Sequence, residues 1–123
     1  MILVDTSVWI DHLRAGDVVL GELLKSGRVL AHPFVIGELA LGSLAERGLV
    51  LGALRRLRQA VVAKDHEMLE FIALRFLYGC GIGYVDAHLL TSARLTPGAS
   101  VWTRDKRLRA AAERLGLAAG LAP

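Results

Sequence analysis

Short apolar runs alternate along this chain with longer segments that have helical periodicity, and this alternation restricts the fold more than any other feature. We expect strands at residues 2–4, 29–31, 61–63 and 99–102, with a last short strand at residues 117–118. The intervening segments predict helices at residues 8–16, 17–26, 33–44, 49–58, 65–77, 85–94 and 104–115. Strands that alternate with helices form βαβ units. The sequence therefore predicts a three-layer α/β domain, with a mostly parallel central sheet flanked by helices.

The size and composition of the chain favour one domain with apolar surface to spare. A chain of 123 residues is too short to divide into two sizeable cores, so residues 1–123 are expected to form a single domain. The hydrophobic fraction of 54% leaves apolar area for a protein partner. No stretch is long and apolar enough for a membrane span, and the start of the chain does not resemble a secretory signal. The single cysteine, Cys80, fits the reducing cytoplasm.

The charge of the chain is too mild to indicate nucleic-acid binding by itself. Its formal net charge is +3, which would not repel a polyanion. One basic cluster, Arg55, Arg56 and Arg58, is interpreted as a solvated helix face. The other cluster surrounds Asp105, so its residues are candidates for holding phosphate: Arg104, Lys106, Arg107 and Arg109.

Four acidic residues occupy positions that are typical of a functional site. Asp5 ends the first predicted strand and Asp105 follows the strand at 99–102, so both should lie beyond the carboxyl ends of a parallel sheet. Asp86 follows a glycine-containing loop and has apolar neighbours. Glu38 lies in a predicted helix between apolar residues, where a charge is expected only with a partner. The joint pattern predicts one acidic site.

Each acid also has a purely structural interpretation. Asp5 and Asp105 could cap the helices that follow them, and Asp86 could be a first-turn acid favoured by the helix dipole. Glu38 could lie on an exposed strip of its helix. Taken singly, these interpretations are the simpler ones, but together the four acids favour a shared site.

A cluster of carboxylates favours hard divalent cations. Carboxylates that lie close together repel one another unless a cation neutralises them. Ligand sets made only of oxygen suit Mg²⁺ or Mn²⁺, which can activate water and stabilise charge on a phosphoryl group. The chemistry expected of such a site is hydrolysis of a phosphodiester.

Four segments of the chain resemble the PIN-domain family, in particular its VapC-type toxins. Residues 2–10, ILVDTSVWI, are similar to the opening of these proteins, and residues 35–39, VIGEL, to their second acidic segment. Residues 81–90, GIGYVDAHLL, and 102–108, WTRDKRL, are similar to the third and fourth segments. The resemblance spans nearly the whole chain and keeps the order of the segments.

The resemblance implies a PIN fold and an endoribonuclease that depends on Mg²⁺ or Mn²⁺. Its acidic quartet would be Asp5, Glu38, Asp86 and Asp105, of which Asp5 and Asp86 match the usual metal ligands. The hydroxyls of Thr6 and Thr103 match positions that support a metal-associated water or a substrate phosphate. It also implies a homodimer and a VapB-type antitoxin whose tail enters the acidic groove.

Two other functions remain open from the sequence. One is a catalytically silent module that binds an antitoxin or RNA, with the acids acting only as a docking groove. The other is an aspartyl-phosphate α/β domain, which also places an aspartate after its first strand. The dehalogenase pattern, however, has a second aspartate where this chain has Ser7, and a receiver domain would have only Asp65 as its phosphorylatable residue.

Overall fold

The computed structural model describes residues 1–122 and contains a parallel sheet with the strand order β3-β2-β1-β4. Its strands are β1 (Ile2–Val4), β2 (Val29–Ala31), β3 (Arg58–Gln59) and β4 (Ser100–Trp102). β1 lies inside the sheet, where Leu3 pairs with Leu30 of β2 on one side and with Val101 of β4 on the other. The predicted parallel sheet is confirmed.

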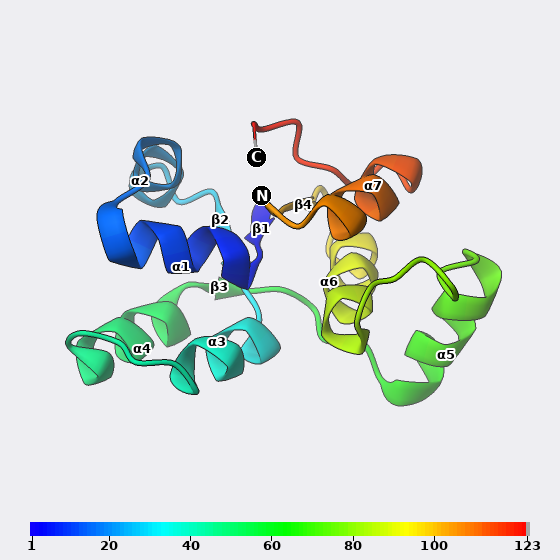
Figure 1. Cartoon of the computed structure of the whole chain (residues 1–123), viewed down its shortest axis with the longest axis horizontal. Coiled ribbons are helices and arrows are strands. Elements are labelled where there is room, and N and C mark those ends of the chain that lie inside the picture. Colours follow the sequence, from blue (N-terminus) through cyan, green and yellow to red (C-terminus); the bar gives the residue numbers. More distant parts are fainter. Residues whose placement is uncertain (123) are drawn as a thin grey trace.

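Helices cover the sheet from both sides, so the predicted three-layer arrangement is also confirmed (Figure 1). In that view the first four helices lie on one side of β1 and the remaining helices on the other. Their bounds are α1 (Thr6–Ala15), α2 (Val18–Lys25), α3 (Pro33–Ala40), α4 (Arg47–Arg56), α5 (Asp65–Leu74), α6 (Tyr84–Leu95) and α7 (Lys106–Arg114). Across residues 1–122, no helix has the length and apolar character needed to cross a membrane.

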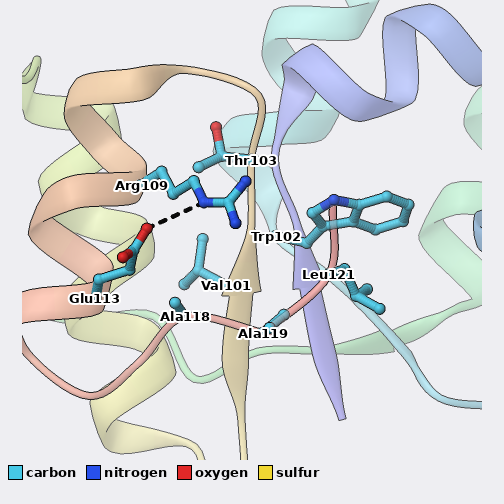
Figure 2. Close-up of a pocket in the computed structure, with 9 residues that line it drawn as sticks. Val101, Trp102, Thr103, Arg109, Glu113, Ala118, Ala119 and Leu121 are labelled. Carbon is cyan, nitrogen blue, oxygen red and sulfur yellow. Dashed lines mark hydrogen bonds and ion pairs between the residues drawn. The ribbon is translucent and has the colours of Figure 1, made fainter. Parts of the chain in front are cut away.

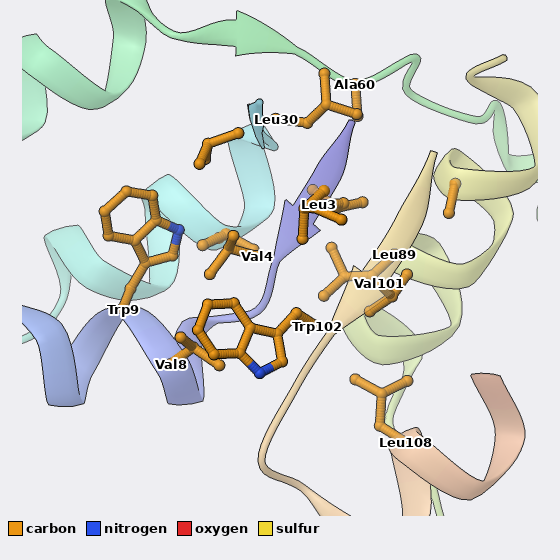
Figure 3. Close-up of a cluster of buried hydrophobic side chains, with 14 of the residues drawn as sticks. Leu3, Val4, Val8, Trp9, Leu30, Ala60, Leu89, Val101, Trp102 and Leu108 are labelled. Carbon is orange, nitrogen blue, oxygen red and sulfur yellow. The ribbon is translucent and has the colours of Figure 1, made fainter. Parts of the chain in front are cut away.

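The core lies against both faces of β1. Figure 3 shows Val4 of β1 facing Val8 and Trp9 from α1, while Leu89 of α6 and Leu108 of α7 lie beyond β4. All of these side chains are buried. The central strand is short but apolar at each of its three positions, as expected when both faces of a sheet are covered. Its carboxyl end is consequently fixed within the fold.

The strand predicted at residues 61–63 is wrong. The chain instead pairs with β2 slightly earlier, through Arg58 and Gln59 of β3, and the amide of Ala60 still donates to the carbonyl of Ala31. The amide of Val61 does not bond to β2 but donates to the hydroxyl of Thr96. Strand propensity depends strongly on context, and here hydrogen bonding at the sheet edge outweighed the preference of the valines at 61 and 62.

Several helix ends also differ from the predictions. α3 ends at Ala40 and α5 at Leu74, earlier than the predicted Leu44 and Leu77. After α5, Phe76 adopts a left-handed conformation with a φ of 54°, which stops the helix. α5 begins at Asp65, as predicted, with Lys64 as the residue that precedes it. Residues 117–118 form only an isolated bridge, which joins Ala118 to Val101.

His32 holds the start of α3, the helix that carries Glu38. Its Nδ1 accepts a hydrogen bond from the amide of Phe34 at 3.0 Å, and its Nε2 lies 3.0 Å from the hydroxyl of Ser92 in α6. The ring is fully buried. Burial, together with the nearby His88, lowers the pKa of His32 from 6.5 to about 4. His32 therefore stays neutral in the folded protein at pH values where the unfolded chain binds a proton.

We predict that His32 makes the fold sensitive to acid between about pH 6.5 and 4. The unfolded state binds more protons in this window, so the free energy of unfolding should fall as the pH falls, by about 3 kcal/mol in total. His32→Asn does not titrate there and keeps a capping oxygen, so it should lose much less stability on acidification. Urea unfolding at a series of pH values measures the difference.

The matched control is His66→Asn, which replaces an exposed histidine. If both variants and the parent lose the same stability between pH 6.5 and 4, the buried His32 ring is not the source of the acid sensitivity.

Candidate active site

Asp5 lies at the carboxyl end of β1, where the pairing with β4 brings distant parts of the chain together. Its amide donates to the carbonyl of Trp102, the last residue of β4, at 2.9 Å. Thr103, the next residue, therefore lies beside Asp5, and both residues are buried. The prediction that the ends of these two strands meet at one edge of the sheet is confirmed.

The side chain of Asp5 does not cap the helix that follows it. It makes no capping hydrogen bond to α1. Instead its Oδ2 accepts from the hydroxyl of Thr103 at 2.7 Å and from that of Ser7 at 2.8 Å. The Thr103 hydroxyl in turn accepts from the amide of Asp105 at 3.0 Å, and the Ser7 hydroxyl accepts from the amide of Arg104. Both hydroxyls thus link Asp5 to the turn between β4 and α7.

Asp105 caps α7, which confirms the structural interpretation of this residue from the sequence. Its Oδ1 accepts from the amides of Arg107 and Leu108, at 2.9 and 3.0 Å. The residue is exposed. Capping occupies only one of its two carboxylate oxygens, so it does not exclude a second role.

Asp86 lies in the first turn of α6, where its Oδ2 accepts from the amide of Gly83 at 3.2 Å. Burial raises the pKa of this carboxyl, and the negative charges of Asp5, Asp105 and Glu38 raise it further, against the opposing effect of the Gly83 N–H. Asp86 therefore lies close enough to the other three acids to interact with them electrostatically, although the four come from different segments of the chain.

Glu38 differs from the expectation that it would be enclosed by apolar residues. It lies on α3 with its side chain exposed, on a strip that also includes Gly37. Its Oε1 accepts from the hydroxyl of Thr6, the first residue of α1, at 2.7 Å. Its apolar neighbours Val35 and Leu39 face the core instead. Helical periodicity turns a residue in an apolar stretch of sequence toward the surface.

The four carboxylates share one pattern. In each, one oxygen accepts a hydrogen bond from a hydroxyl or a backbone amide, and the other oxygen has no partner among residues 1–122. None of the four is in an ion pair in this part of the chain. The donors are all neutral, so they orient the carboxylates without neutralising their charge.

The oxygen ligands of the four acids suit a divalent cation. For all four to contact one site, the side chains of Glu38 and Asp105 would have to change rotamer. The available donors are carboxylate and hydroxyl oxygens, which hard ions such as Mg²⁺ and Mn²⁺ prefer. As placed, no three acidic, histidine or cysteine side chains of residues 1–122 are close enough together to share one ion. Glu38 and Asp105 are exposed, and exposed side chains change rotamer at little cost. The residues present thus fit a hard ion.

Arg104, predicted as a supporting residue that could hold phosphate, is already paired. Its guanidinium donates to the carboxylates of Asp11 and Asp17, and it stacks over the ring of Trp102. It therefore joins α1 and α2 to the end of β4. Arg109 of the same basic cluster pairs with Glu113.

The cavity shown in Figure 2 is separate from the acids. It has a volume of about 210 Å³ and lies between β4, α7 and the segment after α7, with the ion pair of Arg109 and Glu113 at its wall. None of the four acids lines it. Two of its lining residues also contact Asp5: Thr103 through its hydroxyl and Trp102 through its backbone carbonyl.

Sequence reasoning missed the role of Ser7. Its hydroxyl is one of the two donors to Asp5, and it also accepts from the backbone of the β4–α7 turn. The sequence does contain an indication of this role: Ser7 follows an aspartate at a strand end by two residues, and from there its hydroxyl can reach back to the carboxylate.

Comparison with known proteins identifies the architecture. The family model of the PIN domain matches residues 2–114. The chain belongs to the PIN-domain family. Among characterised proteins, Ribonuclease VapC32 of Mycobacterium tuberculosis is 53% identical over 118 residues, which cover 96% of this chain and 95% of that protein, in both strain CDC 1551 / Oshkosh and strain ATCC 25618 / H37Rv. The resemblance to VapC-type PIN-domain proteins is thereby confirmed.

We predict that Thr103→Val destabilises this PIN domain by about 1–3 kcal/mol at pH 7. The change removes one of the two donors to a buried carboxylate, which is then poorly solvated. Urea unfolding without divalent ions measures the loss. The control is Thr91→Val, because the buried Thr91 hydroxyl donates only to a helix carbonyl, that of Ala87. Equal losses in the two variants would contradict the role given to Thr103.

Proposed function

We propose that the chain is a cytoplasmic endoribonuclease that depends on Mg²⁺ or Mn²⁺ and acts through Asp5, Glu38, Asp86 and Asp105. The observation that carries this proposal is the shared pattern of the four carboxylates. Each is oriented by a neutral donor and keeps one oxygen free, which is how second-shell hydrogen bonds prepare ligands for a metal ion. The 53% identity to a protein named as a ribonuclease supports RNA as the substrate.

Asp5 and Asp86 would hold the ion directly, and Glu38 and Asp105 would complete the site through a second ion or through water. When bound, a divalent ion supplies an activated water and stabilises the charge that develops on the phosphate. Thr103 and Ser7 fix the rotamer of the buried Asp5, whereas the exposed Glu38, which accepts from Thr6, would change rotamer to reach the ion. Burial raises the pKa of Asp86 most, and repulsion from the other three acids raises it further; a cation relieves that repulsion, so the same charges favour its binding.

We predict that Asp5→Asn lowers the rate of RNA cleavage by at least about a hundredfold, a loss of about 3 kcal/mol in transition-state stabilisation. Parent activity should require added Mg²⁺ or Mn²⁺ and disappear with a chelator. End mapping of cellular RNA after incubation with the purified chain gives both the rate and the cleavage site.

A second measurement is independent of activity. Mg²⁺ or Mn²⁺ should raise the thermal unfolding midpoint of the parent and not that of Asp5→Asn, because an ion that binds only the folded state stabilises it. Asp65→Asn, which changes an exposed acid outside the quartet, is the control and should behave like the parent. A silent binding module would show no cleavage in any of these proteins.

We further propose that the chain is the toxin of a VapBC-type pair and acts as a homodimer. A groove beside α1 supports an antitoxin as its occupant. An apolar hollow of about 170 Å³ between α1 and α4 continues, through Leu13 and Val50, into one of about 500 Å³ that reaches Glu38. An apolar segment with a basic residue at its end matches this groove in shape and charge.

We predict that Leu13→Arg weakens inhibition by a co-expressed VapB-type antitoxin at least about tenfold, because it places a charge in the apolar groove. RNA cleavage should not change. Leu49→Arg, on α4 but outside the groove, is the control. The inhibition constant of the purified pair is the measurement, and equal inhibition of both variants would place the antitoxin elsewhere.

A further inference from the structure

Two large aromatic side chains are exposed in the segment between α5 and α6. Phe76 is 65% exposed and Tyr78 is 64% exposed. Their ring centroids are 6.1 Å apart and the ring planes are inclined by 60°, so they form a single edge-to-face pair at the surface. Neither the core nor the acidic quartet uses these rings.

The segment that presents them is held in a defined shape by α7. The guanidinium of Arg114 donates to the carbonyls of Arg75 and Phe76, at 2.9 and 3.3 Å. These bonds hold the backbone where Phe76 takes its left-handed conformation. The backbone that carries Phe76 is thus held in place by α7.

A second arginine of α7 contacts the other end of the segment. The side chain of Arg107 lies against Gly81, with Nη1 only 2.7 Å from the place a Cβ would occupy. The φ of Gly81 is 77°, a left-handed conformation that favours glycine. Arg107 and Arg114 are seven residues apart and lie on the same face of the helix.

The surroundings of the aromatic pair are basic. Arg75, Arg107 and Arg114 are all exposed, and none of them is in an ion pair within residues 1–122. Exposed rings among unpaired arginines match the chemistry of single-stranded nucleic acid, whose bases stack and whose phosphates are negative. A protein partner would match the rings but would not require the uncompensated positive charge.

The aromatic segment is directly connected to two of the four acids. Its last residue, Gly83, donates its amide to Asp86, and the amide of Arg107 donates to Asp105. The end of the aromatic segment at Gly83 therefore adjoins Asp86, and Arg107, which contacts Gly81 of the segment, adjoins Asp105.

We infer that Phe76 and Tyr78 form a stacking platform for unpaired bases of the RNA substrate, with Arg75, Arg107 and Arg114 binding its phosphates. This inference rests on the proposed ribonuclease function. It assigns substrate positioning to a segment outside the acidic quartet. Bases inside a duplex are already stacked on one another, so the platform selects single-stranded RNA.

The test is binding of RNA by chains that carry Asp5→Asn, which keeps the probe intact during the measurement. The probes are a fluorescein-labelled single-stranded RNA of twelve nucleotides and the duplex of the same sequence, followed by fluorescence anisotropy. Adding Tyr78→Ala should weaken single-strand binding about tenfold and leave duplex binding unchanged. Tyr78→Trp should retain the affinity, because it keeps a stacking surface.

Leu69→Ala is the matched control, since Leu69 is also 65% exposed but lies on α5 away from the pair. Unchanged thermal midpoints verify that the variants fold. Equal single-strand affinity in Tyr78→Ala, Phe76→Ala and the control overturns the inference. If Tyr78→Ala instead lowers the molar mass in solution without changing RNA affinity, the rings form a protein interface and the inference is again overturned.

Cleavage assays separate this inference from the proposed function. In the cleaving parent background, Tyr78→Ala should raise KM for the single strand about tenfold with kcat unchanged, as expected for a positioning residue. A parent that binds RNA through Tyr78 but cleaves none with Mg²⁺ or Mn²⁺ would refute the ribonuclease proposal and leave the platform standing.

Discussion

The hydrogen bond from the Thr103 hydroxyl to the Asp5 carboxylate joins residues 98 positions apart, and the placement of Asp5 against the turn that carries Asp105 depends on it. It forms because β1 and β4 pair in parallel and end at the same level of the sheet. The same contact sets the position of Asp105, whose amide donates to the Thr103 hydroxyl. One buried polar contact thus relates the central strand, the start of α1 and the start of α7.

The acids serve the fold and the proposed chemistry through different oxygens. Asp105 uses one oxygen to cap α7, and Asp86 uses one to hold Gly83 at the start of α6. Each interaction satisfies backbone groups that a helix terminus otherwise leaves open. The structural and functional interpretations of these residues are therefore compatible, and a capping role alone does not argue against a ligand role.

Much of this arrangement could be predicted from the sequence, because it depends on local patterns. The apolar runs located β1, β2 and β4, and aspartates at strand ends indicated the edge of the sheet where a site would lie. Errors arose where distant contacts decide the outcome. The amide of Val61 bonds to Thr96, 35 residues away, so the valines at 61 and 62 do not continue the sheet. Similarly, the pairing of Arg104 with Asp11 and Asp17 depends on how α1 and α2 fold back.

The aromatic segment after α5 was not predictable in this way either. Phe76 and Tyr78 read as ordinary apolar residues near a helix end, and only the bonds from Arg114 show that their backbone is fixed.

Those bonds have an evolutionary consequence. Arg114 donates to main-chain carbonyls, which every amino acid possesses, so the side chain at position 76 can change without loss of these bonds where the new residue tolerates the left-handed conformation. PIN-domain proteins that keep these two bonds can therefore vary the side chain at position 76 while the backbone keeps its path.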